Sequence, residues 1–87
     1  MRISQTSQFK KDIKKQQKRG KDLSKIKVLI ELLLSGAALP AKCRDHSLTG
    51  NWVGHRDCHV EPDWILIYKI SEDELRLERT GGHSDLF

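Results

Sequence analysis

The sequence predicts an α+β fold in which a helical hairpin packs on one face of a small antiparallel sheet. Three observations support this fold class. Apolar residues recur at helical spacing between residues 7 and 35, and the stretch 52–70 is typical of two consecutive strands. Residues 75–80 then alternate between apolar and polar, as expected for a third strand with one apolar face. Helices followed by a run of strands indicate the α+β class.

The stretch 52–70, WVGHRDCHVEPDWILIYKI, predicts two strands joined at Glu61-Pro62-Asp63. The second strand, 64–70, is nearly all apolar, as a strand covered on both faces should be. Pro62 has no N–H for a ladder, so it belongs to the connection. The first strand alternates, with one side formed by Val53, His55, Asp57 and His59 and the other by Trp52, Gly54, Arg56, Cys58 and Val60. His59 and Asp63 therefore flank the turn.

The segment 7–19 predicts the first helix, because Phe9 and Ile13 lie one turn apart and form a thin apolar stripe. Most of the other positions are basic: Lys10, Lys11, Lys14, Lys15, Lys18 and Arg19. Judged from these residues alone, a solvated helix face is slightly favoured over a surface that faces phosphates or a protein partner.

The second helix follows after a short link. Gly20 ends the first helix and Asp22 can cap the second. A broad apolar face identifies the second helix as the main core helix: Leu23, Ile26, Leu29, Ile30, Leu33 and Leu34. Gly36 closes this helix and Pro40 blocks its continuation. Two helices so closely linked predict an antiparallel hairpin.

The segments that flank the predicted central strands give weaker sequence signals. Residues 1–6 give a weak signal for a short first strand, and residues 41–51 are polar and predict a loop. In the third strand, strict alternation places Arg79 on the face of Leu75 and Leu77. A guanidinium there needs an anion, which is either a carboxylate of the protein or a phosphate from outside.

Composition excludes several classes of protein. Eighty-seven residues predict a single domain, 1–87, with one modest core. The net charge of +4 suits an anionic partner such as nucleic acid, but charge alone is weak support, because many small soluble proteins are mildly basic. Two cysteines without CxxC spacing do not predict a disulfide framework. No apolar run reaches the roughly 18 residues of a membrane span, and there is no signal-peptide segment, so we expect no membrane partner and a cytoplasmic location.

The polar residues that stand out lie at predicted strand ends and in loops: His46, His59, Asp63, Arg79 and His83. If they converge, they suit RNA cleavage without a metal or cofactor. In that reaction the ribose 2′-hydroxyl attacks the adjacent phosphate, which requires a base, an acid for the leaving 5′-oxygen and a cation. Histidine, with an unperturbed pKa of about 6.5, suits acid or base work. Arginine can bind two phosphate oxygens at once.

Simpler explanations compete. A single histidine on a small protein is usually just solvated, and Arg79 can pair with Glu61 or Glu78. Aromatic residues are more often core than base-stacking platforms, which applies to Trp52, Trp64 and Tyr68.

A zinc site is another alternative, because Cys43-x-x-His46 and His55-x-x-Cys58 look like two ligand pairs. Residues three apart on a strand face opposite sides, however, and no tight turn is predicted between His55 and Cys58. A zinc-stabilised binding module is therefore the weaker hypothesis.

The segments KCRDHSLTGNWVGHRDCHVEPDWILIYKI and LRLERTGGHSDLF, with the basic N-terminal helices, closely resemble the YafQ branch of the RelE/ParE toxin superfamily. The resemblance covers nearly the whole chain. It implies the RelE-like fold, an N-terminal helical hairpin packed on a small twisted, mainly antiparallel sheet. It also implies a toxin of a type II toxin–antitoxin pair, which enters the ribosomal A site, cuts mRNA there without a metal and is silenced by its antitoxin.

The resemblance carries function onto His46, His59, Asp63, Arg79, His83 and Phe87. It implies proton transfer and substrate positioning for the histidines and the aspartate, contact with the scissile phosphate for the arginine, and shaping of the site for Phe87. We therefore expect a ribosome-dependent mRNA endonuclease with His59 or His46 as base and His83 as acid.

The expected partners are a cognate antitoxin, the ribosome and mRNA. Ribosomal RNA would contact the first-helix lysines Lys10, Lys11, Lys14, Lys15 and Lys18. The alternative from another class is a non-enzymatic toxin of the ParE type that inhibits gyrase, although such a binder needs no proton shuttle.

Overall fold

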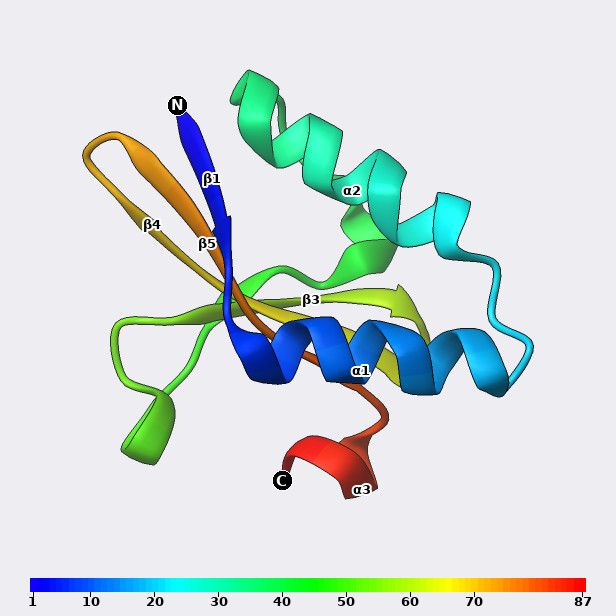
Figure 1. Ribbon diagram of the computed structural model, residues 1–87. Helices are drawn as coiled ribbons and strands as arrows, with labels where there is room; N and C mark the ends of the chain where they lie inside the picture. Colours follow the sequence, from blue (N-terminus) through cyan, green and yellow to red (C-terminus); the bar gives the residue numbers. More distant parts are fainter.

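One five-stranded sheet forms the centre of the structure, a computed structural model that describes residues 1–87 (Figure 1). The strand order is β1-β5-β4-β3-β2. β1 is parallel to β5, and every other neighbouring pair is antiparallel. The strands are β1 (Arg2–Gln5), β2 (His46–Ser47), β3 (Arg56–Glu61), β4 (Trp64–Ser71) and β5 (Glu74–Gly81). The helices are α1 (Ser7–Lys18), α2 (Leu23–Ser35) and α3 (His83–Leu86), with 3-10 turns η1 (Ala41–Cys43) and η2 (Gly50–Trp52).

The two long helices begin and end where the sequence predicts, to within one residue. Thr6 caps α1 by accepting the Phe9 N–H at 2.9 Å, and Asp22 caps α2 by accepting the Ser24 N–H at 3.0 Å. Gly36 ends α2 with φ of +75°, a left-handed conformation that glycine adopts without steric cost. The helices run in opposite directions and diverge, so the predicted hairpin is splayed (Figure 1). Neither is long and apolar enough to cross a membrane.

The sheet carries a core on each face. Alternate residues of β4 point to opposite faces, so Leu66 joins the larger core beneath α1 and α2, while Ile65 and Ile67 join a smaller core beneath Leu86 of α3. The first five residues of β4 are almost completely buried. This explains why β4 reads as a continuous apolar run, and it confirms the prediction that both of its faces are covered. The predicted α+β architecture is therefore correct.

Several predicted details around β3 were wrong. β3 begins at Arg56, because residues 50–52 form η2 and Gly54 turns the chain with φ of +86°. Glu61 belongs to β3, so the connection is only Pro62-Asp63. The predicted loop 41–51 contains η1 and the short edge strand β2, which are too brief to leave a periodic signal.

A bulge in β5 overturns the predicted direction of Arg79. Leu77 is opposite Tyr68 of β4, but Arg79 is opposite Ile67, so Glu78 is the extra residue. Because adjacent residues of β4 face opposite sides, Arg79 lies on the face of Ile67 and not on that of Leu77. Strict alternation was the wrong assumption, since an inserted residue reverses the pattern beyond it.

Candidate active site

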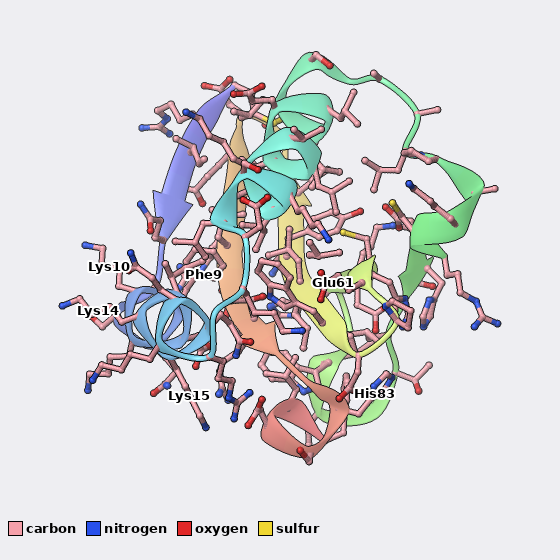
Figure 2. All side chains as sticks on the ribbon, turned by 90° about the vertical axis from the view of Figure 1, so that its right-hand side faces the viewer. Phe9, Lys10, Lys14, Lys15, Glu61 and His83 are labelled. Atoms are coloured by element: carbon pink, nitrogen blue, oxygen red, sulfur yellow. The ribbon has the colours of Figure 1, made fainter.

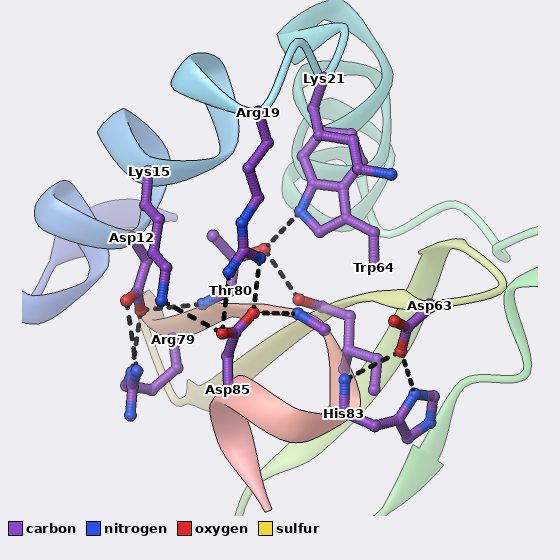
Figure 3. Close-up of polar contacts among 12 residues, drawn as sticks. Asp12, Lys15, Arg19, Lys21, Asp63, Trp64, Arg79, Thr80, His83 and Asp85 are labelled. Atoms are coloured by element: carbon purple, nitrogen blue, oxygen red, sulfur yellow. Dashed lines mark hydrogen bonds and ion pairs between the residues drawn. The ribbon is translucent and has the colours of Figure 1, made fainter.

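The β3–β4 turn and the start of α3 bring Asp63 and His83 into contact. Asp63 Oδ1 accepts the His83 backbone N–H at 2.9 Å and lies 2.6 Å from His83 Nδ1 (Figure 3). These two hydrogen bonds, the backbone one first, lower the pKa of Asp63 below its usual range. Because a carboxylate only accepts, His83 Nδ1 carries the hydrogen. His83 Nε2 is then free to give or take a proton.

Two glycines make this contact sterically feasible. A Cβ at Gly82 would lie 3.1 Å from Asp63 Oδ2 and 3.2 Å from the Asp63 carbonyl oxygen, and a Cβ at Gly81 would lie 3.0 Å from the Cβ of Asp85. Contacts this short are rare for a real Cβ, so any side chain at these positions would force the neighbours apart. Glycine therefore lets α3 begin directly against the turn.

The rings of His59 and Phe87 both lie close to the His83 ring. The ring centroids of His59 and His83 are 5.7 Å apart, and those of His83 and Phe87 are 6.4 Å apart. Phe87 lies one helical turn beyond His83 and remains exposed, while the neighbouring Leu86 anchors α3 in the smaller core. His59 Nδ1 lies 3.3 Å from the Cys43 carbonyl oxygen, which only accepts, so Nδ1 is the donor in this contact and Nε2 has no hydrogen-bond partner.

His46 completes the group through Asp57, its partner across β2 and β3. His46 Nδ1 donates to the Arg44 carbonyl at 2.8 Å and lies 3.0 Å from Asp57 Oδ1. Asp57 is only 3% exposed, and no donor satisfies Oδ1 with hydrogen-bond geometry. Burial raises the pKa of Asp57, and the electrostatic influence of His46, His59 and His83 opposes that rise. A buried carboxylate thus lies beside His46, and His59 is two residues further along the same strand.

Asp85 fastens α3 to α1. Its carboxylate accepts from Arg19 Nη1 at 2.8 Å, Arg19 Nη2 at 3.1 Å, Lys15 Nζ at 3.2 Å and the Gly82 N–H at 2.8 Å (Figure 3). The Arg19 hydrogen bonds, followed by the Gly82 bond, hold the pKa of Asp85 well below its usual range. The helix that carries His83 is therefore fixed to a second helix that lies far from it in sequence.

Arg79 is not part of the histidine group. Its Nε and Nη2 donate to Asp12 of α1 at 2.8 and 3.2 Å, and Asp12 also accepts the Thr80 N–H at 3.2 Å. In Figure 3 the Arg79 guanidinium and the His83 ring lie on opposite sides of Asp85. The partner is thus neither Glu61 nor Glu78, and the structure does not place this cation beside the histidines.

The first-helix lysines divide into two kinds. Lys10 and Lys14 point away from the body of the protein (Figure 2), and they share this exposure and the absence of an ion-pair partner with Lys11 and Lys18. Lys15 instead pairs with Asp85. The exposed set is a basic face suited to phosphates.

The structure does not bring the suggested zinc ligands together. Cys43 and Cys58 are buried in the larger core, where burial raises the pKa of both thiols. His55 packs edge-on against Trp52, and its Nε2 lies 3.7 Å from Glu78 Oε2. No group of three or more His, Cys, Asp or Glu residues is placed to hold a metal ion. Trp64 and Tyr68 are core aromatics, with Trp64 Nε1 donating to Thr80 Oγ1 at 2.9 Å.

The profile of a known family, the bacterial toxin of type II toxin–antitoxin systems called YafQ, matches residues 1–87. The chain belongs to the YafQ family. It is 54% identical to the mRNA interferase toxin YafQ of Escherichia coli K12 over 86 residues, which cover 98% of this chain and 94% of that toxin.

Solved structures agree with this family assignment. The E. coli DinJ–YafQ complex contains a chain with 53% identity and a TM-score of 0.93, covering 100% of this chain and 99% of that one. A metal-bound toxin from Helicobacter pylori has 37% identity and a TM-score of 0.93 over the same shares of the two chains. The RelE-like fold expected from the resemblance is confirmed.

In this YafQ-family chain the fold gathers five of the six expected site residues: His46, His59, Asp63, His83 and Phe87. Sequence reasoning missed Asp57, although strand alternation had placed it on the face of His59. The signal available in the sequence is its place between His55 and His59 on one face of the predicted strand.

Replacing Asp85 in this YafQ-family protein should weaken the anchoring of α3. Asp85→Ala removes the acceptor of the Gly82 N–H, and we expect it to cost about 1 kcal/mol of unfolding free energy at pH 7. A carboxyl with a lowered folded pKa stabilises above its unfolded pKa of about 3.9 and loses that contribution as pH falls through the folded value. The difference from wild type should therefore shrink below pH 4 in urea titrations.

Glu72→Ala is the matched control, because Glu72 is exposed in the β4–β5 turn and has no ion-pair partner. It should change stability by less than about 0.5 kcal/mol. A pH-independent loss in Asp85→Ala would contradict the assigned ionic role.

Proposed function

We propose that this toxin cuts mRNA in the ribosomal A site by acid–base catalysis that uses its own side chains and no metal. Membership of the YafQ family makes it an mRNA interferase toxin, which is an endoribonuclease. The observation that carries the catalytic proposal is the Asp63–His83 pair beside His59, with Nε2 of both histidines free. Residues 1–87 together would form the single toxin domain.

In the proposed reaction the ribose 2′-oxygen attacks the adjacent phosphorus, and the bond from phosphorus to the 5′-oxygen breaks. His59 or His46 takes the 2′-hydroxyl proton through Nε2, and His83 gives a proton to the leaving 5′-oxygen. The products are a 2′,3′-cyclic phosphate and a free 5′-hydroxyl, so no metal, oxidant or water is required for this step.

Asp63 would orient His83, since it bonds both the ring and the backbone of that residue. The buried Asp57 would stabilise positive charge on His46 or His59 as one of them accepts the proton. The Phe87 ring lies 6.4 Å from that of His83, between centroids, and would limit the positions open to a base or ribose. Together these contacts hold the acid in a fixed geometry.

The charge of α1 and the family of this chain indicate two kinds of partner. Ribosomal RNA phosphates would bind the exposed α1 lysines, and Lys15 would contribute less because Asp85 already neutralises it. The E. coli relative forms a complex with DinJ, so we expect a cognate antitoxin for this chain as well. We expect the toxin to act in the cytoplasm, where ribosomes and mRNA are located.

Induced expression should stop growth and produce mRNA cuts that follow the reading frame, because cleavage in the A site inherits the ribosome's register. The 5′ ends of transcripts should be mapped after induction of the wild type and of His83→Ala. The wild type should give in-frame ends that His83→Ala lacks. Co-expression of the cognate antitoxin should abolish both the cuts and the growth arrest.

If growth stops without mRNA cuts while DNA supercoiling changes, the hypothesis of a ParE-type gyrase inhibitor replaces that of an mRNA endonuclease. The histidine group argues against the gyrase hypothesis, because a toxin that only binds its target does not need imidazole nitrogens that can exchange protons.

Cleavage should not depend on zinc. Histidines supply the acid and the base, so a zinc-selective chelator should leave the rate on programmed ribosomes unchanged, while ribosomal magnesium is kept. The measurement is the cleavage rate with and without chelator, together with the metal content of the purified toxin. Loss of activity in a protein that carries stoichiometric zinc would overturn the metal-free mechanism.

A further inference from the structure

The arginines described above are already paired with carboxylates, Arg19 with Asp85 and Arg79 with Asp12. Arg79 is on the histidine face of the sheet, but Asp12 holds its Nε and Nη2. Phosphoryl chemistry concentrates negative charge on the non-bridging oxygens, and a donor aimed at those oxygens is usually a large part of catalysis. Some other basic group should therefore lie within reach of His59 or His83.

A hollow of about 420 Å³ opens beside His59 and is lined by basic residues. Lys25, Lys42 and Arg44 border it, and Glu61 is its one carboxylate. Its volume is within the range of about 300–1,000 Å³ that small-ligand sites occupy. Because His59 is itself a lining residue, any anion in the hollow would contact a proposed catalytic base.

Glu61 cannot neutralise the whole hollow. It accepts from Lys21 and Lys25 at 2.7 Å each, so its charge is already shared between two lysines. Lys42 and Arg44 have no ion-pair partner. The nearby carboxylate of Asp45 is bound to Arg56 and to the Tyr68 hydroxyl. Two uncompensated cations therefore remain beside His59.

The backbone conformation of Arg44 indicates a functional role for its charged side chain. Arg44 has φ of +50°, the one non-glycine residue with a positive φ in the chain. In this conformation its carbonyl accepts the His46 hydrogen, and the residue borders the hollow. A left-handed arginine is sterically costly, whereas glycine would adopt the same turn freely. An arginine held there at a conformational cost points to a role for its charge.

We infer that Lys42 and Arg44 form a phosphate-binding subsite that holds the mRNA backbone against His59. This inference rests on the proposed endonuclease function and names the cations which that function requires. RNA would lie across the hollow with a phosphodiester between the two cations and the imidazole. Arg44 can bind two phosphate oxygens at once, and Lys42 adds a point charge.

The decisive variant is Arg44→Gly, because it removes the charge while relieving the left-handed backbone. Lys42→Ala removes the second cation, and Lys69→Ala is the matched control, since Lys69 is an exposed lysine of β4 without an ion-pair partner. Cleavage should be measured in single turnovers on ribosomes programmed with mRNA, alongside the thermal midpoint of each variant.

We expect Arg44→Gly and Lys42→Ala each to lower the cleavage rate about 10-fold or more, and the double variant about 100-fold. Arg44→Gly should unfold no earlier than wild type, so that its activity falls without a loss of stability. Arg44→Lys should retain more activity than Arg44→Gly. Lys69→Ala should cleave at the wild-type rate.

Binding measurements separate messenger from ribosomal phosphates. With a 2′-O-methylated, uncleavable codon, the double variant should bind less tightly than wild type only when mRNA occupies the A site. Equal weakening on ribosomes without mRNA would show that these cations contact ribosomal RNA and would overturn the subsite. Wild-type cleavage by Arg44→Gly and Lys42→Ala would also overturn it. If wild type and Lys69→Ala fail to cleave, the endonuclease function itself is wrong.

Discussion

His83→Ala should cleave mRNA about 100-fold more slowly than wild type, or slower still, while its unfolding free energy changes by no more than about 0.5 kcal/mol. The His83 side chain is 56% exposed and contacts Asp63, which is itself exposed, so the core does not depend on it. The loss of rate should come from loss of the proton donor for the 5′-oxygen. The measurement combines cleavage on programmed ribosomes with urea unfolding of the same preparations.

His59→Ala is the informative companion, because this residue lies in β3 and borders both His83 and the basic hollow. Its rate should fall by a similar factor, with a larger cost in stability. His55→Ala is the control, since His55 packs against Trp52 and lies outside the histidine group. Should His83→Ala cleave at the wild-type rate, the acid must be sought at His46. Should it unfold, His83 is structural.

Asp12→Ala should be the most destabilising single substitution among the polar residues, at about 3–5 kcal/mol. Asp12 is buried, and its carboxylate accepts from Gln8, Arg79 and the Thr80 N–H. Its removal leaves the Arg79 charge and a buried backbone N–H without a partner. In a domain of this size the loss corresponds to a fall in melting temperature of about 12 °C or more.

Two comparisons isolate the ion pair. Lys14→Ala, on the exposed side of the same helix, should change stability by less than about 0.5 kcal/mol. The double variant Asp12→Ala/Arg79→Ala should cost less than the sum of the single variants, because the second substitution removes a charge that the first leaves unpaired. Strict additivity would mean that Asp12 and Arg79 do not stabilise the fold through each other.

Much of the architecture could be predicted from the sequence, because helix caps, helical spacing and the apolar run of β4 are local signals. Asp22 and Gly36 mark the ends of α2 by their own backbone preferences. The extra residue at Glu78 could not be predicted, since a bulge depends on pairing with another strand and leaves the composition of β5 unchanged. The direction of Arg79 was wrong for that reason alone.

The site was predictable only in part. Residue chemistry singled out the histidines and Asp63, and the family resemblance added Phe87. Asp57 was overlooked because a carboxylate gains significance only when burial and its neighbours are known. Lys42 and Arg44 were overlooked because neither belongs to a periodic pattern, and their lack of carboxylate partners is visible only in three dimensions.

The connection that Asp85 makes between α1 and the start of α3 affects the entropic part of the activation barrier. Lys15 of α1 and Arg19, the residue after α1, donate to the Asp85 carboxylate, which also accepts the N–H of Gly82, one residue before His83. Hydrogen bonds and ion pairs thus link the helix proposed to bind ribosomal RNA to the proposed proton donor. Translational and rotational freedom of the acid is lost when the helix docks, before any bond changes, so docking raises the effective molarity of the donor at the scissile phosphate.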